Sequence, residues 1–279
     1  MRRCYALRPF DVYACDGCGL RFRHPLPDQH EVEEMYEDPR YHESAYFRDA
    51  GAGRRRSPEI RIYERGLVDL KRAAGGGRLL DVGCGPGVFL DLARRAGWTV
   101  AGVEFSQRHV ARARARFGLE VQQGDFLTVP FAPASFQAIT MWDFLEHVLD
   151  PRATLAQARR LLAPGGALLV FTIDCTSLFN AAGDLLYRLT RGRAARALEL
   201  LYDARHNYYF TRTALARLLE SEGFAVERWR GDRAHLGRWL SEPAPWYLVA
   251  GGGVVDVLSY AVGRPYRRTA LCRLRPSSA

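Results

Sequence analysis

The feature that most constrains the fold is a short apolar segment that ends in a glycine-rich turn and continues into a helix. Leu79 to Val82 is followed by Gly83-Cys84-Gly85-Pro86-Gly87, and apolar residues then recur at helical spacing. From there on, segments typical of strands and of helices alternate, which indicates parallel strands joined by helical crossovers. The pattern predicts an α/β fold of the Rossmann-like, doubly wound type, with a mostly parallel seven-stranded sheet.

The predicted elements are spaced as in repeated βαβ units. We expect strands at 78–82, 99–103, 119–122, 137–142, 167–172, 224–229 and 269–274, and helices at 59–73, 87–96, 107–117, 151–162 and 213–222. Residues 175–210 and 231–266 interrupt this winding and are rich in Leu, Tyr, Trp and Arg, so we expect helical lid insertions that shape a substrate pocket. Residues 1–56 are expected to form an irregular appendage, and residues 57–279 the main domain.

Charge and apolar content limit the class of protein. The net charge of +9 suggests an anionic partner. However, all but one of the 40 basic residues are arginine, with Lys71 as the one lysine, and this composition indicates a codon bias instead. Hydrophobic residues make up 48%, enough for a core. The start has no apolar leader, and no run reaches the roughly 20 apolar residues of a membrane span. We therefore expect a cytoplasmic protein with reduced thiols.

The glycine-rich turn and two acids predict a nucleoside site. Gly83 and Gly85 allow the backbone to approach a ligand closely, and Glu104 follows the next strand, where an acid accepts from both ribose hydroxyls. The spacing is G-x-G-x-G, not the G-x-G-x-x-G of dinucleotide sites. Asp81 would repel a pyrophosphate, but its charge suits the ammonium group of a methionine moiety.

The segment from Asp81 to Gly87 resembles motif I of the class I S-adenosylmethionine methyltransferases. Four later segments resemble that family in the same order, and with motif I they cover about residues 57–229: 124–126, 136–148, 160–170 and 206–224. The resemblance implies S-adenosylmethionine as cofactor, with Asp125 accepting from the adenine amino group and Phe126 beside the ring. It implies a cofactor site of Asp81, Gly83, Cys84, Gly85, Gly87, Glu104, Phe105, Asp125, Phe126 and Trp142.

The expected base is His147, which follows the fourth strand at the edge where substrates lie in such sheets. Asp143, Glu146 and His147 form D-x-x-E-H. This resembles the E-x-x-E-H of ubiquinone-pathway O-methyltransferases, which is associated with a divalent metal. Asp143 would orient His147 or share such an ion with it; alternatively, Glu146 and His147 only hold the following helix. His206 could face the pocket, whereas His109 is expected on a solvated helix face.

The N-terminal cysteines have the spacing of a metal-binding knuckle. Cys15 and Cys18 form C-x-x-C, Cys4 precedes them and His24 follows. The stretch resembles the zinc-ribbon appendage of some methyltransferases, but the first C-x-x-C of that ribbon is absent. We expect at most a partial zinc site at Cys4, Cys15 and Cys18, or a metal-free remnant. Cys84, Cys175 and Cys272 are interpreted as packing residues.

The preferred function is methyl transfer to a small-molecule acceptor, most simply an oxygen nucleophile, in a biosynthetic pathway. An RNA methyltransferase is an alternative, but no Asn-Pro-Pro-Tyr type motif follows the fourth strand, so nucleic acid is disfavoured. A non-catalytic cofactor-binding subunit is the other alternative. The insertions predict an apolar, aromatic or anionic acceptor. Arginines 191, 193 and 196 flank leucines 189, 198, 200 and 201, a pattern that also permits peripheral membrane contact.

Overall fold

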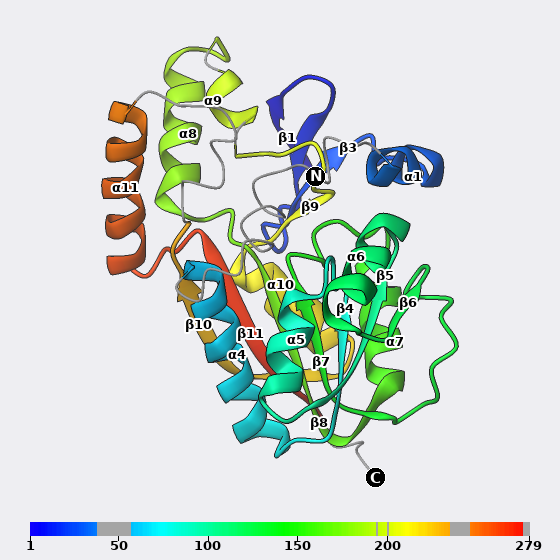
Figure 1. The fold of residues 1–279 in the computed structure, drawn as a ribbon. Helices are drawn as coiled ribbons and strands as arrows, with labels where there is room; N and C mark the ends of the chain where they lie inside the picture. The colour runs from blue at the N-terminus through cyan, green and yellow to red at the C-terminus, as the bar shows by residue number, and fades with distance from the viewer. Residues whose placement is uncertain (38–56, 194, 200, 235–245, 276–279) are drawn as a thin grey trace.

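The main sheet has seven strands and confirms the predicted fold class. The computed structural model describes residues 1–37, 57–193, 195–199, 201–234 and 246–275. The strand order is β10-β11-β8-β7-β4-β5-β6, with β8, β7, β4, β5 and β6 parallel and β11 antiparallel to both neighbours (Figure 1). The bounds are β4 Arg78–Val82, β5 Thr99–Glu104, β6 Val121–Gln123, β7 Phe136–Trp142, β8 Leu162–Ile173, β10 Phe224–Asp232 and β11 Arg267–Leu274.

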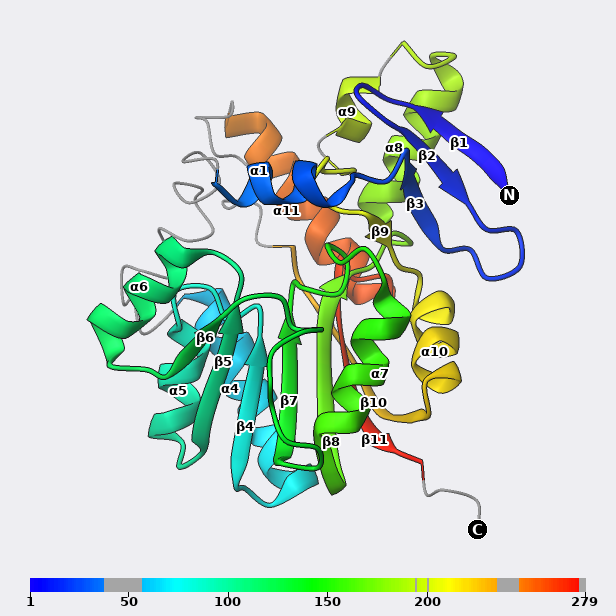
Figure 2. The same ribbon diagram turned by 90° about the vertical axis from the view of Figure 1, so that its right-hand side faces the viewer.

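Helices cover both faces of this sheet, as Figure 2 shows. One hydrophobic cluster packs α4 (Pro58–Ala74), α5 (Val88–Arg95) and α6 (Gln107–Phe117) against one face. A second packs α7 (Pro151–Leu161) and α10 (Arg212–Ser221) against the other. The helices begin at polar caps: the side chains of Ser57, Asp150 and Thr211 each accept a backbone N–H of the first turn.

Residues 1–37 are not irregular, so the expectation was wrong for this part of the N-terminal segment. It forms β1 (Arg2–Ala6), β2 (Asp11–Ala14) and β3 (Arg21–His24), followed by α1 (Gln29–Glu37). A fourth strand, β9 (Tyr208–Tyr209), pairs with β3 and comes from the first insertion. A third hydrophobic cluster joins Tyr5, Leu7, Phe10 and Val12 to insertion residues that include Leu198, Tyr202 and Tyr209. The boundary predicted near residue 56 lies outside the described residues, and the division into two domains stays a prediction.

The two insertions are helical, as expected. Residues 175–210 contain α8 (Leu178–Leu189) and α9 (Ala195–Glu199) as well as β9, and α11 (Trp246–Ala261) lies in the second insertion. Together with the N-terminal sheet, they form a layer above the carboxyl ends of the parallel strands (Figures 1 and 2). We call this the upper layer. Among the described residues, no helix is long and apolar enough to cross a membrane.

Candidate functional site

The glycine-rich turn joins the end of β4 to the start of α5, where the sequence predicted it. Gly83, Gly85 and Gly87 have φ angles of 70°, 53° and 81°, in the left-handed region that favours glycine. A Cβ on Gly83 would lie 2.4 Å from Cδ2 of Phe144, and a Cβ on Gly87 would lie 2.7 Å from Cδ1 of Leu119. A larger residue at either position would therefore strain the backbone and displace a neighbouring side chain.

Glu104 ends β5 beside this turn, and its carboxylate connects the turn to α6. Its Oε2 accepts the backbone N–H of Gly85 at 2.8 Å, and its Oε1 accepts that of Ser106 at 2.9 Å. Burial raises the pKa of Glu104, and these backbone N–H groups oppose the rise. A carboxylate offers about four acceptor positions. Two hydrogen bonds therefore leave acceptor capacity for the ribose hydroxyls that the sequence assigns to Glu104.

His109 is not on a solvated face, so that prediction was wrong. Its side chain is buried, and its Nδ1 lies 4.0 Å from Oε1 of Glu104. The reason is the orientation of α6, which turns His109 toward the sheet together with Val110 and Ala113. His109 therefore lies behind Glu104 and supports the cofactor region from inside the protein.

Asp81 is a second buried carboxyl group next to the same turn. It is 2% exposed, and Thr140 Oγ1 of β7 donates to its Oδ1 at 2.6 Å. Burial raises the pKa of Asp81 to about 8, although the Thr140 hydrogen bond opposes the rise and the nearby Glu104 adds to it. Two buried carboxyl groups at one turn favour a positively charged ligand, because a cation would restore the ionised form of both.

The other predicted cofactor residues fall into two groups. Asp125 is exposed in the loop after β6, where its Oδ1 accepts the backbone N–H two residues later at 2.9 Å, and Phe105 is half-buried after β5. Phe126 and Trp142 are buried in hydrophobic clusters that serve opposite faces of the sheet, and Cys84 is buried with Trp142's cluster. The structure thus brings Asp81 and Glu104 to the glycine turn, and it uses Phe126 and Trp142 for packing.

His147 lies in the loop after β7, half-buried beneath the upper layer. Its Nδ1 is 2.9 Å from the carbonyl oxygen of Arg205, so the neutral ring donates from Nδ1 and keeps Nε2 as an acceptor. Its ring packs edge-on against His206, with centroids 4.6 Å apart. Burial lowers the pKa of His147 and, together with the His147 charge, lowers that of His206 to about 3. Both rings are therefore neutral near pH 7, and His147 has the tautomer of a base.

The segment that carries His206 holds the loop after β7 in place. Asn207 Nδ2 donates to the carbonyl of His147 at 2.7 Å, and the backbone N–H groups of Asn207 and Tyr208 donate to the carbonyl of Glu146 at 2.8 and 3.1 Å. Tyr208 Oη donates to the carbonyl of Leu149 at 3.0 Å. The sequence singled out His206 but gave no sign of this clamp, because its two halves are about 60 residues apart.

Glu146 is the buried group at the site whose loss of hydration is least compensated by hydrogen bonds. It is 0% exposed, and neither carboxylate oxygen has a hydrogen-bond partner in the part of the chain that the structure describes. Burial, with the neighbouring Asp143 charge, raises the pKa of Glu146 to about 8. Asp143 itself has a φ of 46° and faces Arg267, whose Nη2 lies 4.0 Å from Oδ2. The structure thus pairs Asp143 with an arginine and does not hydrogen-bond it to His147.

One group of side chains in the described ranges has the geometry of a metal site. Ligand atoms of Glu146, His147 and His206 lie within 4.8 Å of one another, a donor set that suits zinc or another transition ion. Asp143, which we expected to share an ion with His147, is not in this group. If His147 binds a metal ion, Glu146 and His206 are therefore the residues that would bind it together with His147.

The three N-terminal cysteines do not gather into such a group within the described residues. Cys15 and Cys18 lie in the turn between β2 and β3, where the backbone N–H groups of Cys18 and Gly17 lower the pKa of the Cys15 thiol. Cys4 lies on β1 and lines a separate cavity. Cys84, Cys175 and Cys272 are buried free thiols, as their interpretation as packing residues requires.

Known proteins resemble this chain over part of its length. The chain is 32% identical to 24-methylenesterol C-methyltransferase 2 of Oryza sativa subsp. japonica over 56% of its own length and 46% of that protein. It is 30% identical to the ubiquinone biosynthesis O-methyltransferase of Thiobacillus denitrificans, over 62% and 75% respectively. The chain spans about half the length of the first curated relatives that it matches.

The fold is shared with solved structures. An S-adenosylmethionine-dependent methyltransferase from Mesorhizobium loti superposes with a TM-score of 0.53 at 20% identity, covering 75% of this chain and 96% of that one. The family model described as a methyltransferase domain matches residues 54–228, which is more than half of the chain. This protein therefore belongs to the methyltransferase-domain family.

Proposed function

We propose that this protein is an S-adenosylmethionine-dependent methyltransferase whose acceptor is a small molecule with an oxygen nucleophile. The observation that carries the proposal is the pair of buried carboxyl groups, Asp81 and Glu104, at a turn of three left-handed glycines. The relatives support the substrate class, since their names specify a ubiquinone-pathway O-methyltransferase and a sterol C-methyltransferase.

The residues at the turn fit the proposed cofactor. Asp81 would pair with the methionine ammonium group, and that pairing would favour its ionised form over the neutral one. The carboxylate of Glu104 fixes the turn by accepting the backbone N–H groups of Gly85 and Ser106, and it keeps acceptor capacity for the ribose hydroxyls. The left-handed φ angles of the three glycines allow the tight turn that the cofactor would approach.

The chemical step would depend on positioning and on one proton transfer. The bound cofactor supplies a methyl group on a sulfonium sulfur and its own leaving group. His147 Nε2 would take the proton of the acceptor hydroxyl while Nδ1–H stays bonded to the Arg205 carbonyl. Burial favours the neutral imidazole, which is the form a base needs.

Titration calorimetry with S-adenosylmethionine and with its demethylated product tests the cofactor part. Glu104→Ala removes an acceptor of charged hydrogen bonds and should weaken binding by about 1.5–3 kcal/mol. Glu120→Ala is the matched control, because Glu120 is exposed just before β6. Unchanged affinity in Glu104→Ala, with the wild type binding normally, would remove Glu104 from the site.

The acceptor class requires a separate experiment. The protein would be incubated with methyl-labelled cofactor and either total RNA or a metabolite extract. Label in an extractable small molecule supports the proposal, whereas label in RNA would favour the polyanionic partner suggested by the net charge of +9. Tight cofactor binding without label in either fraction would favour a non-catalytic binding subunit.

A further inference from the structure

Helix α8 of the upper layer exposes an apolar side. Ala182, Leu185, Leu186 and Leu189 recur at the spacing of one helix face, and all four are exposed. Leu189 is 73% exposed and Leu185 58%. The buried residues of α8 are Asn180 and Gly183, and Phe179 and Tyr187 pack against the third hydrophobic cluster, so α8 carries apolar side chains on its outer side as well as on its inner side.

Helix α11 also exposes an apolar stripe. Val254, Val257, Leu258 and Ala261 recur at the same spacing and are exposed. Between residues 252 and 261, where burial is described, the buried side chains are polar: Asp256 accepts from Nε of Arg233 at 3.0 Å, and Ser259 Oγ accepts the backbone N–H of Leu178 at 3.1 Å. The bond from Ser259 to Leu178 also joins α11 to the start of α8.

Because α8 and α11 are neighbours, we treat their two exposed stripes together and call them the outer face. Figure 1 shows α8 and α11 side by side at one end of the molecule. Of the twelve large hydrophobic side chains that are exposed in the described residues, eight belong to this face: Leu185, Leu186, Leu189, Val254, Val257, Leu258, Tyr260 and Val262. So strong a concentration of exposed apolar side chains marks an interaction surface.

The charges around the outer face are positive. The exposed charged residues in 178–193 and 252–264 are Arg188, Arg191, Arg193 and Arg264. The two acids of these segments are paired, Asp184 with Arg21 and Asp256 with Arg233. A surface that is apolar at its centre and cationic at its rim complements an anionic one that has an apolar interior.

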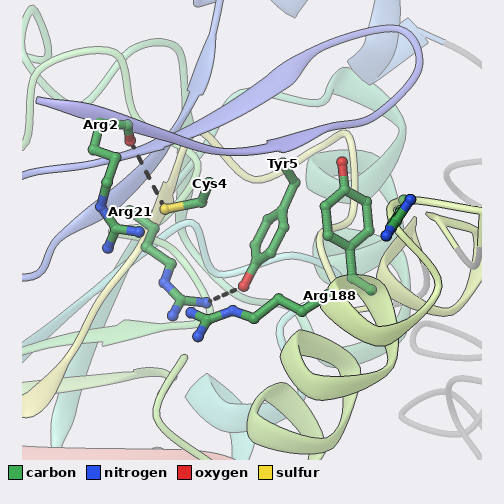
Figure 3. Close-up of a pocket in the computed structure, with 8 residues that line it drawn as sticks. Arg2, Cys4, Tyr5, Arg21 and Arg188 are labelled. Carbon is green, nitrogen blue, oxygen red and sulfur yellow. Dashed lines mark hydrogen bonds between the residues drawn. The ribbon is translucent and has the colours of Figure 1, made fainter.

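A cavity of about 320 Å³ continues this positive rim. It lies between β1 and α8, next to the outer face, and Figure 3 shows Arg2, Arg21 and Arg188 around it. Arg191 completes the set of arginines that line it. Arg21 donates to Tyr5 Oη at 2.9 Å and pairs with Asp184, and Nε of Arg2 lies 3.9 Å from Oδ1 of Asp16. Arg188 and Arg191, which form no ion pair among the described residues, are therefore the arginines most able to bind an anion such as a phosphate.

We propose that the outer face docks on the surface of an anionic lipid bilayer. The leucine and valine stripes would enter the boundary between headgroups and acyl chains, and the arginines would meet the lipid phosphates. Helix α11 spans 16 residues and would lie in the plane of the bilayer. The proposal does not depend on the identity of the methyl acceptor.

Co-sedimentation of the full chain with lipid vesicles tests this docking. We expect binding to vesicles of equal parts phosphatidylglycerol and phosphatidylcholine, and much weaker binding to pure phosphatidylcholine. Leu185→Ser with Leu189→Ser should lower partitioning by about tenfold or more. Arg188→Gln with Arg191→Gln should lower it by about fivefold per arginine and reduce its salt dependence. Val68→Ser, at a 48% exposed valine of α4, is the control and should change partitioning by less than about twofold.

Two results would overturn the proposal. If the wild type is dimeric by light scattering, ignores vesicles, and becomes monomeric in the Leu185 and Leu189 double variant, a second copy covers the outer face. If the wild type is monomeric and ignores both kinds of vesicle, the face does not bind lipid. Calorimetry with S-adenosylmethionine on each variant verifies folding and tests the proposed function separately, because the substitutions lie outside the glycine turn.

Discussion

Helices α4 and α11 carry apolar stripes of the same period, but the stripe of α4 faces the core and the stripe of α11 faces the solvent. In α4, Ile62, Leu67 and Leu70 are buried against the sheet, whereas α11 buries Asp256 and exposes Val257. The period of a pattern therefore establishes that a stripe exists, and the surroundings decide which way it faces. A helix that covers the sheet faces the core, while a helix of the upper layer is free to present its stripe to a partner.

The contrast extends to the regions that contain these helices. The sheet and its helices bury mainly apolar side chains in two clusters. Where the upper layer meets the carboxyl ends of the strands, the buried groups are polar and titratable: Glu146, His147 and His206. We therefore expect substitutions in the sheet and its helices to lower mainly the free energy of unfolding. We expect substitutions at the polar contact with the upper layer to lower mainly turnover.

The largest effect is expected where the two regions meet. If His147 is the base, His147→Ala should lower turnover by about 10²- to 10⁴-fold and leave cofactor affinity nearly unchanged. Because burial lowers the pKa of His147, the wild-type rate should persist below the ordinary histidine value of 6.5 and fall only at lower pH. Steady-state rates across pH, with calorimetry of the cofactor, provide the measurement.

Two alternatives give different results in the same assays. A His147 that only holds the loop would lower the melting temperature in His147→Ala while the folded fraction kept its turnover. A metal held by Glu146, His147 and His206 would make turnover sensitive to a chelator, and His206→Ala would reproduce the effect of chelation. Loss of activity in Asp143→Ala alone would instead restore the predicted role of Asp143.

The next prediction compares a buried leucine of α4 with an exposed leucine of α8. Leu70→Ala should lower the free energy of unfolding by about 2–5 kcal/mol, because it leaves a cavity beside the sheet. Leu185→Ala should change it by less than about 0.5 kcal/mol, because Leu185 is already 58% exposed. Urea unfolding of both variants measures the difference, and equal losses would show that α8 is covered in solution.

A smaller effect separates stability from function at Asp81. The folded-state pKa is raised from 3.8 to about 8, so the neutral carboxyl contributes stability that is full below pH 3.8 and is lost as pH rises toward 8. Asp81→Asn cannot ionise, and its unfolding free energy should exceed that of the ligand-free wild type by about 1–3 kcal/mol at pH 8, with no gain near pH 4. Unfolding at several pH values measures this gain, and the same variant should lose cofactor affinity.

The smallest effect is expected at the cysteine turn. We predict less than one tightly held zinc per chain, and a change of less than about 0.5 kcal/mol in the free energy of unfolding for Cys15→Ser. Elemental analysis that finds one zinc per chain, lost in Cys15→Ser, would contradict this. His24, on β3, would then be the fourth ligand to replace.

The strands of the main sheet could be predicted because each is a short apolar run that ends at a glycine or a polar residue. The expected strands at 78–82 and 137–142 differ from β4 and β7 by at most one residue. The strand expected at 167–172 begins earlier, at Leu162, although the ladder with β7 is irregular between Leu162 and Ala167 and Gly165 has a left-handed φ of 75°. Pro and Gly indicate turns in most contexts, and here Leu162 still pairs with Phe136 of the neighbouring strand.

The parts that could not be predicted depend on contacts between distant residues. Trp142 ends a predicted strand, as a cofactor-binding aromatic could, but Tyr63 of α4 and Phe89 of α5 pack against its ring. His206 comes close to His147 because the insertion folds back over the loop after β7. The orientation of α11 depends on the pairing of the buried Asp256 with Arg233, a residue of another segment, which no local pattern reveals.

The pairing of β3 with the two-residue strand β9 affects how the protein is made. Phe22 meets Tyr208, so the N-terminal sheet cannot be completed until nearly 190 further residues have left the ribosome. At about 5–20 residues per second, that interval lasts roughly 10–40 seconds. Throughout it, the open edge of β3 exposes unpaired backbone groups that can pair with other strands. Strands β1 to β3 thus gain their last partner after β4 to β8 have been made, and a chain arrested before residue 208 would carry an open sheet edge.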